Sequence, residues 1–229
     1  MTNPSPYKST NSSLQHGGYE ANYAAEQAHA VLRNTYGLLA LSLAVAAGAG
    51  WFAMAAGIGF INPFLVIGVY FALLFANAKL ENSSWGVLTV FGITGWLGFS
   101  TGPILNAYVS AGAGDLVTLA LGMTALIFVA MTAVGLTTKK DLSALGNFII
   151  AGILVAFVGS LVGLFTTIPA LQIVVSGMFA VLSSLLIMWQ TNMIVNGGET
   201  NYIRATVTLF VSVYSLFLSL LHLLTAFDE

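Results

Sequence analysis

The sequence has no cysteine and very few charged residues. The absence of cysteine from its 229 residues excludes disulfide frameworks, cysteine-ligated zinc and thiol nucleophiles. Charged residues make up 6% of the chain, against about a quarter in soluble domains, whereas 58% of the residues are hydrophobic. A surface with so few charges does not suit water, so the sequence predicts a protein whose outer surface faces the lipid bilayer.

Basic patches and metal-ligand patterns are also missing. The net charge is −2, and the six Lys and Arg residues form no stripe of the kind that binds nucleic acid. The three histidines, His16, His29 and His222, stand far apart and lack the spacing of metal ligands. We therefore expect no nucleic-acid partner, no metal site and no cofactor.

The uncharged intervals between consecutive charges predict the number of membrane spans. About 20 apolar residues cross a bilayer as a helix. The runs are continuous and lack the alternation of a membrane barrel, so the sequence predicts an all-α, polytopic membrane protein with seven transmembrane helices. These helices are expected at 34–57, 62–79, 84–107, 115–136, 143–166, 169–194 and 203–226.

Proline and glycine positions predict local features of these helices. Pro103 follows Gly102 inside the third predicted helix, which we therefore expect to be kinked or broken there. The small-residue pairs Gly98/Gly102 and Gly159/Gly163 predict close packing between helices.

The basic residues predict the orientation of the helices. With seven spans, all six basic residues fall on one side of the membrane: Lys8, Arg33, Lys79, Lys139, Lys140 and Arg204. Because cytoplasmic loops are enriched in Lys and Arg, we expect a cytoplasmic N-terminus and a periplasmic C-terminus.

The first 32 residues differ in composition from the rest of the chain. Residues 1–32 are rich in Asn, Ser, Tyr, Gly and Ala, which predicts a flexible cytoplasmic N-terminal tail before a transmembrane domain at 33–229. This leader is too long and polar for a signal peptide, so the first apolar helix is expected to remain in the protein. The pattern leaves open whether residues 24–33 continue that helix.

Apart from Lys79, Asp115 and Arg204 at their ends, the predicted spans contain no Asp, Glu, Lys or Arg. Proton relays and ion-coupled transporters ordinarily use ionisable groups inside the membrane. The sequence also lacks the serine, zinc and paired-aspartate motifs of intramembrane proteases. We therefore predict no catalytic residues and no enzymatic activity.

Uncharged polar residues remain as candidates for a functional site. The simplest interpretation is that they form hydrogen bonds between helices, and the alternative is a polar seam lined by Gln190, Ser212 and Ser215. In the loop between the last two helices, Glu199 and Arg204 are a candidate cytoplasmic ion pair, although helix capping also explains this loop. His222 is expected near the membrane interface.

Four segments of the sequence resemble the Bax inhibitor-1/YccA family. They are residues 29–36, 102–106, 136–141 and 197–206, of which the Gly-Gly-Glu-Thr-Asn-Tyr-Ile-Arg-Ala-Thr stretch at 197–206 is the most specific. The resemblance covers residues 29–227 and implies a seven-helix membrane protein.

The resemblance implies two different functions. Some bacterial members bind the inner-membrane protease FtsH with its regulators HflK and HflC, as slow substrates and modulators. Other members are pH-sensitive calcium leak channels that use an aspartate on each of the last two helices. Gln190 and Ser212 stand at those two positions here, so a di-aspartyl pH sensor is not expected.

The leading hypothesis is therefore a non-enzymatic FtsH modulator in the bacterial inner membrane. In this hypothesis the tail offers the protease an unstructured handle, although an inert terminus is the simpler interpretation, and the packed bundle resists extraction. The alternative is a cation leak channel without the pH sensor, and a scaffold role is a third possibility. The sequence does not predict the oligomeric state.

Overall fold

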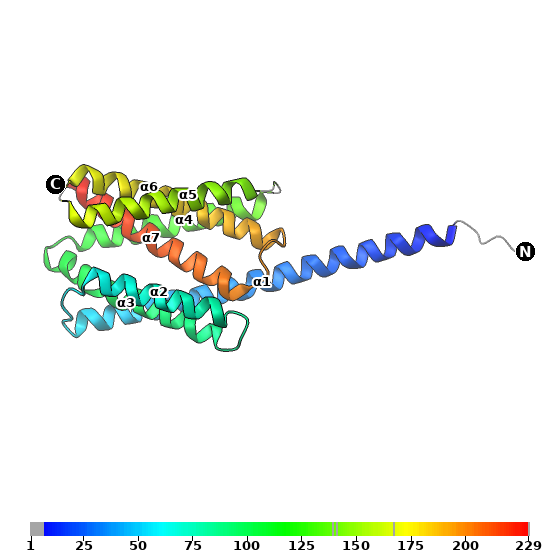
Figure 1. The fold of residues 1–229 in the computed structure, drawn as a ribbon, viewed down its shortest axis with the longest axis horizontal. Coiled ribbons are helices and arrows are strands. Elements are labelled where there is room, and N and C mark those ends of the chain that lie inside the picture. Colours follow the sequence, from blue (N-terminus) through cyan, green and yellow to red (C-terminus); the bar gives the residue numbers. More distant parts are fainter. Residues whose placement is uncertain (1–6, 139, 141, 167, 229) are drawn as a thin grey trace, which may run out of the picture.

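The fold is a bundle of seven membrane-length α-helices. The computed structural model describes residues 7–138, 140, 142–166 and 168–228, and these residues contain seven helices and no strand. Each of the seven includes a segment long and apolar enough to cross a membrane, which confirms the predicted span count. The helices shown in Figure 1 are α1 Tyr7–Ala55, α2 Pro63–Leu80, α3 Gly86–Ser110, α4 Gly114–Thr137, α5 Ser143–Phe165, α6 Pro169–Val195 and α7 Tyr202–Asp228.

The turns between helices follow from local sequence. Asn62 caps α2, because its side-chain Oδ1 accepts a hydrogen bond from the Phe64 backbone N–H at 2.9 Å, and Pro63 occupies the first turn. After α1 and α3 the chain takes left-handed backbone angles at Gly57 (φ 64°) and Gly112 (φ 81°). Glycine adopts these angles without the steric cost of a Cβ atom, so both helices end there.

Helix α1 differs from its predicted extent. It begins at Tyr7, so it includes most of the segment predicted as a tail, and Figure 1 shows it extending beyond the ends of the other helices. The apolar part that suits a membrane begins only at Ala25. Flexibility of residues 1–32 stays a prediction.

Helix α3 was predicted to be kinked or broken at Pro103, and the prediction of a break is wrong. The helix continues through Pro103 to Ser110. Two glycines that precede the proline lie close to α1: a Cβ atom at Gly98 would lie 2.2 Å from the Ala46 carbonyl oxygen, and one at Gly102 would lie 2.6 Å from the Gly50 carbonyl oxygen. Close contact with α1 therefore holds the last turn of α3 before the proline.

The second predicted glycine pair behaves differently. A Cβ atom at Gly159 would meet the Val175 side chain at 2.9 Å, so α5 and α6 approach closely there. Nothing lies within 4 Å of the corresponding position at Gly163. The prediction of close packing is therefore correct for Gly159 and wrong for Gly163.

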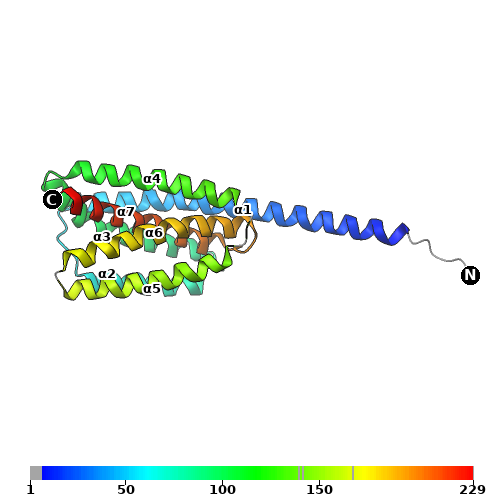
Figure 2. The same ribbon diagram turned by 90° about the horizontal axis from the view of Figure 1, so that it is seen from above.

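Helix α7 lies at the centre of the bundle. It packs against α1, α3, α4 and α6, and Figures 1 and 2 show it crossing between the other helices. Its side chains form much of the apolar core, including Leu209, Phe210, Leu216 and Leu221, each at most 1% exposed. The other helices are arranged around it.

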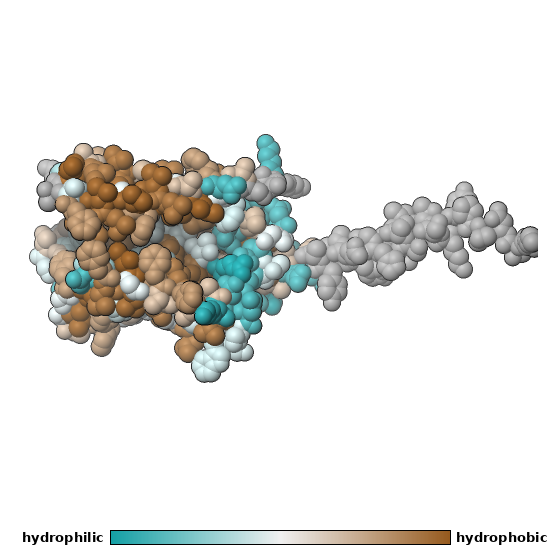
Figure 3. All heavy atoms as spheres, in the orientation of Figure 1, coloured by the Kyte–Doolittle hydropathy of each residue, from teal (hydrophilic) through white to brown (hydrophobic). Residues whose placement is uncertain are grey.

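The outer surface divides into an apolar belt and a polar end. Figure 3 shows hydrophobic residues over most of one face of the bundle and hydrophilic residues gathered near one end. Large apolar side chains such as Phe75, Leu126 and Phe148 are more than 60% exposed, as expected for a surface that faces lipid. We call the end of the bundle that carries Arg33, Lys79, Lys140 and Arg204 the basic end. Its cytoplasmic orientation stays a prediction.

Candidate functional site

An ion-pair network joins two loops at the basic end. The Glu81 carboxylate, at the end of α2, accepts hydrogen bonds from Arg204 Nε at 3.2 Å and from Arg204 Nη2. Glu199 Oε2 lies 3.9 Å from Arg204 Nη1. The Arg204 side chain is 54% exposed, whereas those of Glu81 and Glu199 are 11% and 13% exposed. The arginine therefore lies over two largely covered carboxylates.

The structure thus gives Arg204 a closer partner than the predicted one. Sequence reasoning proposed Glu199 and missed Glu81, because Glu81 is 123 residues away along the chain. Its position on the same predicted side of the membrane was the only available signal.

Asn201 strengthens the link between the same two loops. Its Oδ1 accepts hydrogen bonds from the backbone N–H groups of Ile203 at 2.9 Å and Arg204 at 3.2 Å, which caps the start of α7. Its Nδ2 donates to the Glu81 carbonyl oxygen at 3.2 Å and to Asn82 Oδ1 at 3.0 Å. One side chain therefore fixes both the helix start and the neighbouring loop.

Of the three predicted seam residues, Gln190 and Ser212 are buried in neighbouring helices, and Ser215 is half-buried. Gln190 is 3% exposed and Ser212 is 1% exposed, and their helices α6 and α7 pack together. Ser212 Oγ donates to the Thr208 carbonyl oxygen at 2.7 Å, within its own helix. Among the described residues, no hydrogen bond joins Gln190 to Ser212, and Gln190 Nε2 has no partner.

Two further buried side-chain oxygens, both on α1, were not predicted. Thr35 Oγ1 and Ser42 Oγ on α1 are completely buried and have no hydrogen-bond partner in the described part of the chain. The Thr35 backbone carbonyl accepts a hydrogen bond from Thr206 on α7 at 3.3 Å. Buried polar groups without partners are uncommon and costly, so these atoms are candidates for a functional role. None of these side chains changes charge in the physiological pH range.

Other polar side chains form hydrogen bonds between helices, as the simplest interpretation predicted. Asn192 Nδ2 on α6 donates to the Thr138 carbonyl oxygen at 2.5 Å, and Asn77 Nδ2 on α2 donates to Thr89 Oγ1 on α3 at 2.7 Å. The Tyr36 hydroxyl on α1 lies 2.9 Å from Thr191 Oγ1 on α6. The residues in the described ranges include no group of three or more His, Cys, Asp or Glu residues that suits a metal ion.

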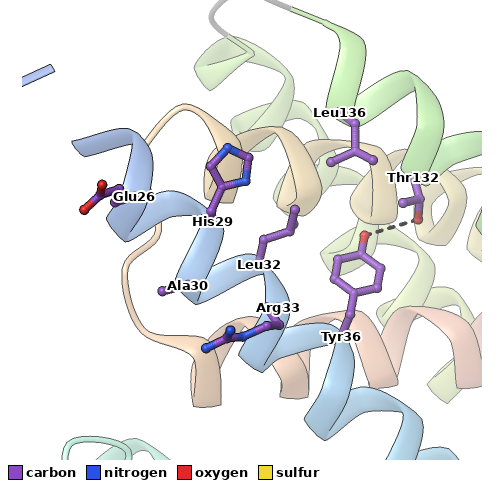
Figure 4. Close-up of a pocket in the computed structure, with 8 residues that line it drawn as sticks. All are labelled: Glu26, His29, Ala30, Leu32, Arg33, Tyr36, Thr132 and Leu136. Carbon is purple, nitrogen blue, oxygen red and sulfur yellow. Dashed lines mark hydrogen bonds between the residues drawn. The ribbon is translucent and has the colours of Figure 1, made fainter. Parts of the chain in front are cut away.

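A pocket of about 710 Å³ opens between α1 and α4 at the basic end. Figure 4 shows Tyr36 and Leu136 on the two facing helices, with the Tyr36 hydroxyl hydrogen-bonded to Thr132 Oγ1 at 3.3 Å. The part of α1 farther from the bundle adds three ionisable side chains to the lining: Glu26, His29 and Arg33. An apolar interior with a charged rim is typical of a surface that receives a partner at the membrane interface.

Comparison with known families gives these features a context. The profile described as "Inhibitor of apoptosis-promoting Bax1" (Bax1-I) matches residues 28–229. The chain belongs to the Bax1-I family. In this Bax1-I protein the match covers all seven membrane-length segments except the first three residues of the first, Ala25 to Gln27.

Individual relatives cover most of the same region. An uncharacterized protein of Pseudomonas aeruginosa is 44% identical over 92% of this chain and 96% of its own length. The Escherichia coli K12 protein named "Modulator of FtsH protease YccA" is 46% identical over 86% of this chain and 90% of its own length. A protein of Escherichia coli O6:H1 with the same identity and coverage is named "Inner membrane protein YccA".

Proposed function

We propose that this Bax1-I protein is a bacterial inner-membrane protein that binds and modulates the FtsH protease and has no catalytic activity of its own. The observation that carries the proposal is the 46% identity, over 86% of the chain, to a protein named as a modulator of that protease. The regulators HflK and HflC belong to the proposed assembly through the family resemblance.

Features of the basic end support this proposal. Helix α1 extends beyond the bundle on that side, which gives a protease a segment to engage. The pocket between α1 and α4 lies where that extension meets the bundle. In the proposed mechanism, FtsH engages the N-terminal segment and pulls against the packed helices, whose slow extraction keeps the protease occupied.

The N-terminal segment provides the first test. We expect deletion of residues 2–25 to prevent degradation by purified FtsH in vesicles, because the enzyme loses its point of engagement. A control chain in which a Gly-Ser linker of equal length replaces residues 2–25 keeps the reach of the segment but not its sequence, and we expect it to be degraded. Equal turnover of the deleted and unchanged chains would refute the handle. Copurification of FtsH, HflK and HflC in mild detergent tests binding separately.

A cation leak is the second candidate function, and the unpartnered buried polar atoms of Thr35, Ser42 and Gln190 favour it. None of these three side chains carries a titratable group. If calcium passes along them, we expect its flux in reconstituted vesicles to vary little between about pH 6 and 8.

Two variants test the leak. We expect the Gln190→Leu, Ser212→Ala double variant to abolish flux, and the Gln190→Asp, Ser212→Asp double variant to make it strongly pH-dependent, because two close carboxylates share a proton. A steep pH response in the unchanged protein would contradict the assignment of Gln190 and Ser212 to the aspartate positions. Absence of calcium flux at every pH tested would refute the hypothesis of a cation leak.

A further inference from the structure

A second hollow lies between α1 and α4, farther from the basic end. It has a volume of about 310 Å³ and we call it the α1–α4 hollow. Helices α1 and α4 both pack against α7, whereas few of their described residues pack against each other. The hollow is the space left between them, with α3 and α7 as its floor. Its lining includes Ala47 and Trp51 on α1, Thr101 on α3, Leu121 on α4, and Phe210 and Tyr214 on α7.

Small residues on α1 keep this space open. Ala46, Ala47 and Gly50 face it, and none has a side chain that reaches across to α4. Helix α1 does not fill the gap by moving, because it is held against α3 where a Cβ atom at Gly98 would lie 2.2 Å from the Ala46 carbonyl oxygen. The hollow is therefore a product of tight α1–α3 packing.

The depth of the hollow places it in the hydrocarbon region. An α-helix rises 1.5 Å per residue, so its α1 lining, from Leu43 to Met54, lies roughly 15 to 32 Å beyond Arg33. Because the hydrocarbon core is about 30 Å thick, the hollow reaches from near the bilayer centre into the leaflet opposite the basic end. Its lining contains no charged residue.

The polar groups in the lining are already satisfied. Thr101 Oγ1 donates to the Leu97 carbonyl oxygen at 2.7 Å, so the Tyr214 hydroxyl, 2.8 Å away, donates to Thr101. Thr124 Oγ1 donates to the Ala120 carbonyl oxygen at 2.7 Å. The lining therefore offers a ligand mainly apolar contacts, which favours a hydrocarbon.

The volume limits which hydrocarbon fits. An apolar cavity of about 150 Å³ holds benzene, so 310 Å³ has room for about a dozen carbon atoms. A partner helix, about 10 Å across, does not enter such a space. We propose that the α1–α4 hollow binds one fatty acyl chain of a phospholipid from the leaflet opposite the basic end. This inference is independent of the proposed protease partner.

Photolabelling of the full-length protein in vesicles tests the proposal. The probe is a phosphatidylcholine with a diazirine in the middle of one acyl chain, present in trace amounts in phosphatidylethanolamine and phosphatidylglycerol. We expect labelled peptides to concentrate on residues 43–54 of α1 and 121–124 of α4. The lipid-facing α5 residues Leu154 and Val155, which are 60% and 62% exposed, report labelling by bulk lipid.

A matched pair of variants separates a specific site from bulk lipid. Ala47→Phe fills the hollow, so labelling of the hollow should fall about tenfold. Ala44→Phe adds the same side chain one turn away, at an exposed position that is not part of the lining. This control variant should leave the labelling unchanged. Leu121→Trp fills the hollow from α4 and repeats the test if Ala47→Phe does not fold. Equal labelling of the hollow and of α5, or no difference between the two phenylalanine variants, would overturn the proposal.

Discussion

Among the described glycines, Gly98 makes the closest approach to a neighbouring backbone, and Gly98→Ala perturbs this contact between α1 and α3 with a single methyl group. At Gly98 the added Cβ atom would lie 2.2 Å from the Ala46 carbonyl oxygen, 2.6 Å from Ala46 Cα and 2.7 Å from its carbonyl carbon. All three are backbone atoms, so no side chain can rotate out of the way. Helix α1 itself has to retreat.

The size of the effect follows from these distances. Non-bonded carbon atoms prefer separations of about 3.5 to 4.0 Å, so α1 moves by about 1 Å or more and loses contacts along its length. Overpacking of this kind costs about 1–3 kcal/mol. At about 2–4 °C per kcal/mol for a chain of this size, the Tm should fall by roughly 2 to 12 °C.

Gly95→Ala provides the matched control, one turn earlier on the same helix. A Cβ atom at Gly95 would have an ordinary contact of 3.7 Å with Val45 Cγ1, and alanine favours the helix by up to about 1 kcal/mol. We expect an unchanged or higher Tm for this variant when thermal unfolding is followed in one detergent. Equal Tm values for the Gly95 and Gly98 variants would refute the packing argument. If the proposed function holds, the Gly98 variant should also be degraded faster by FtsH.

Two further substitutions test the buried polar groups. Asn192→Leu should lower the free energy of unfolding by about 0.6–2 kcal/mol, because α6 loses its hydrogen bond to the Thr138 carbonyl. Gln172→Leu, at an exposed position of the same helix, should change it little. Similar effects of the two substitutions would argue against the hydrogen bond. Gln190→Met should leave the free energy of unfolding unchanged or raise it by about 1–2 kcal/mol, because it removes a buried amide nitrogen without a hydrogen-bond partner. A clearly lower Tm would show instead that this amide is hydrogen-bonded.

The sequence predicted the number of helices and most of their ends. Charge is expensive in hydrocarbon, so the intervals between charged residues mark the spans regardless of how the helices pack. The contacts between helices, which depend on packing, were predicted less well. The pattern of small residues shows that a helix is able to approach its neighbour, but only the structure shows that Gly98 does so and Gly163 does not.

The candidate site shows the same limit. Gln190 and Ser212 were identified from their residue type at membrane depth, and both are buried in neighbouring helices. The Glu81–Arg204 contact was missed, because it depends on which loops are neighbours at the basic end. The unpartnered hydroxyl of Ser42 was missed because serine in an apolar helix usually bonds to its own backbone and gives no signal by itself.

The central position of α7 has a consequence for biogenesis. This helix supplies a large share of the buried side chains, yet it follows α1 to α6 along the chain. Synthesis proceeds from the N-terminus, so α1 to α6 enter the membrane before the helix they surround exists. A chain that stops before α7 therefore leaves the core-facing surfaces of α1, α3, α4 and α6 without this partner, and assembly of the bundle depends on synthesis continuing through α7.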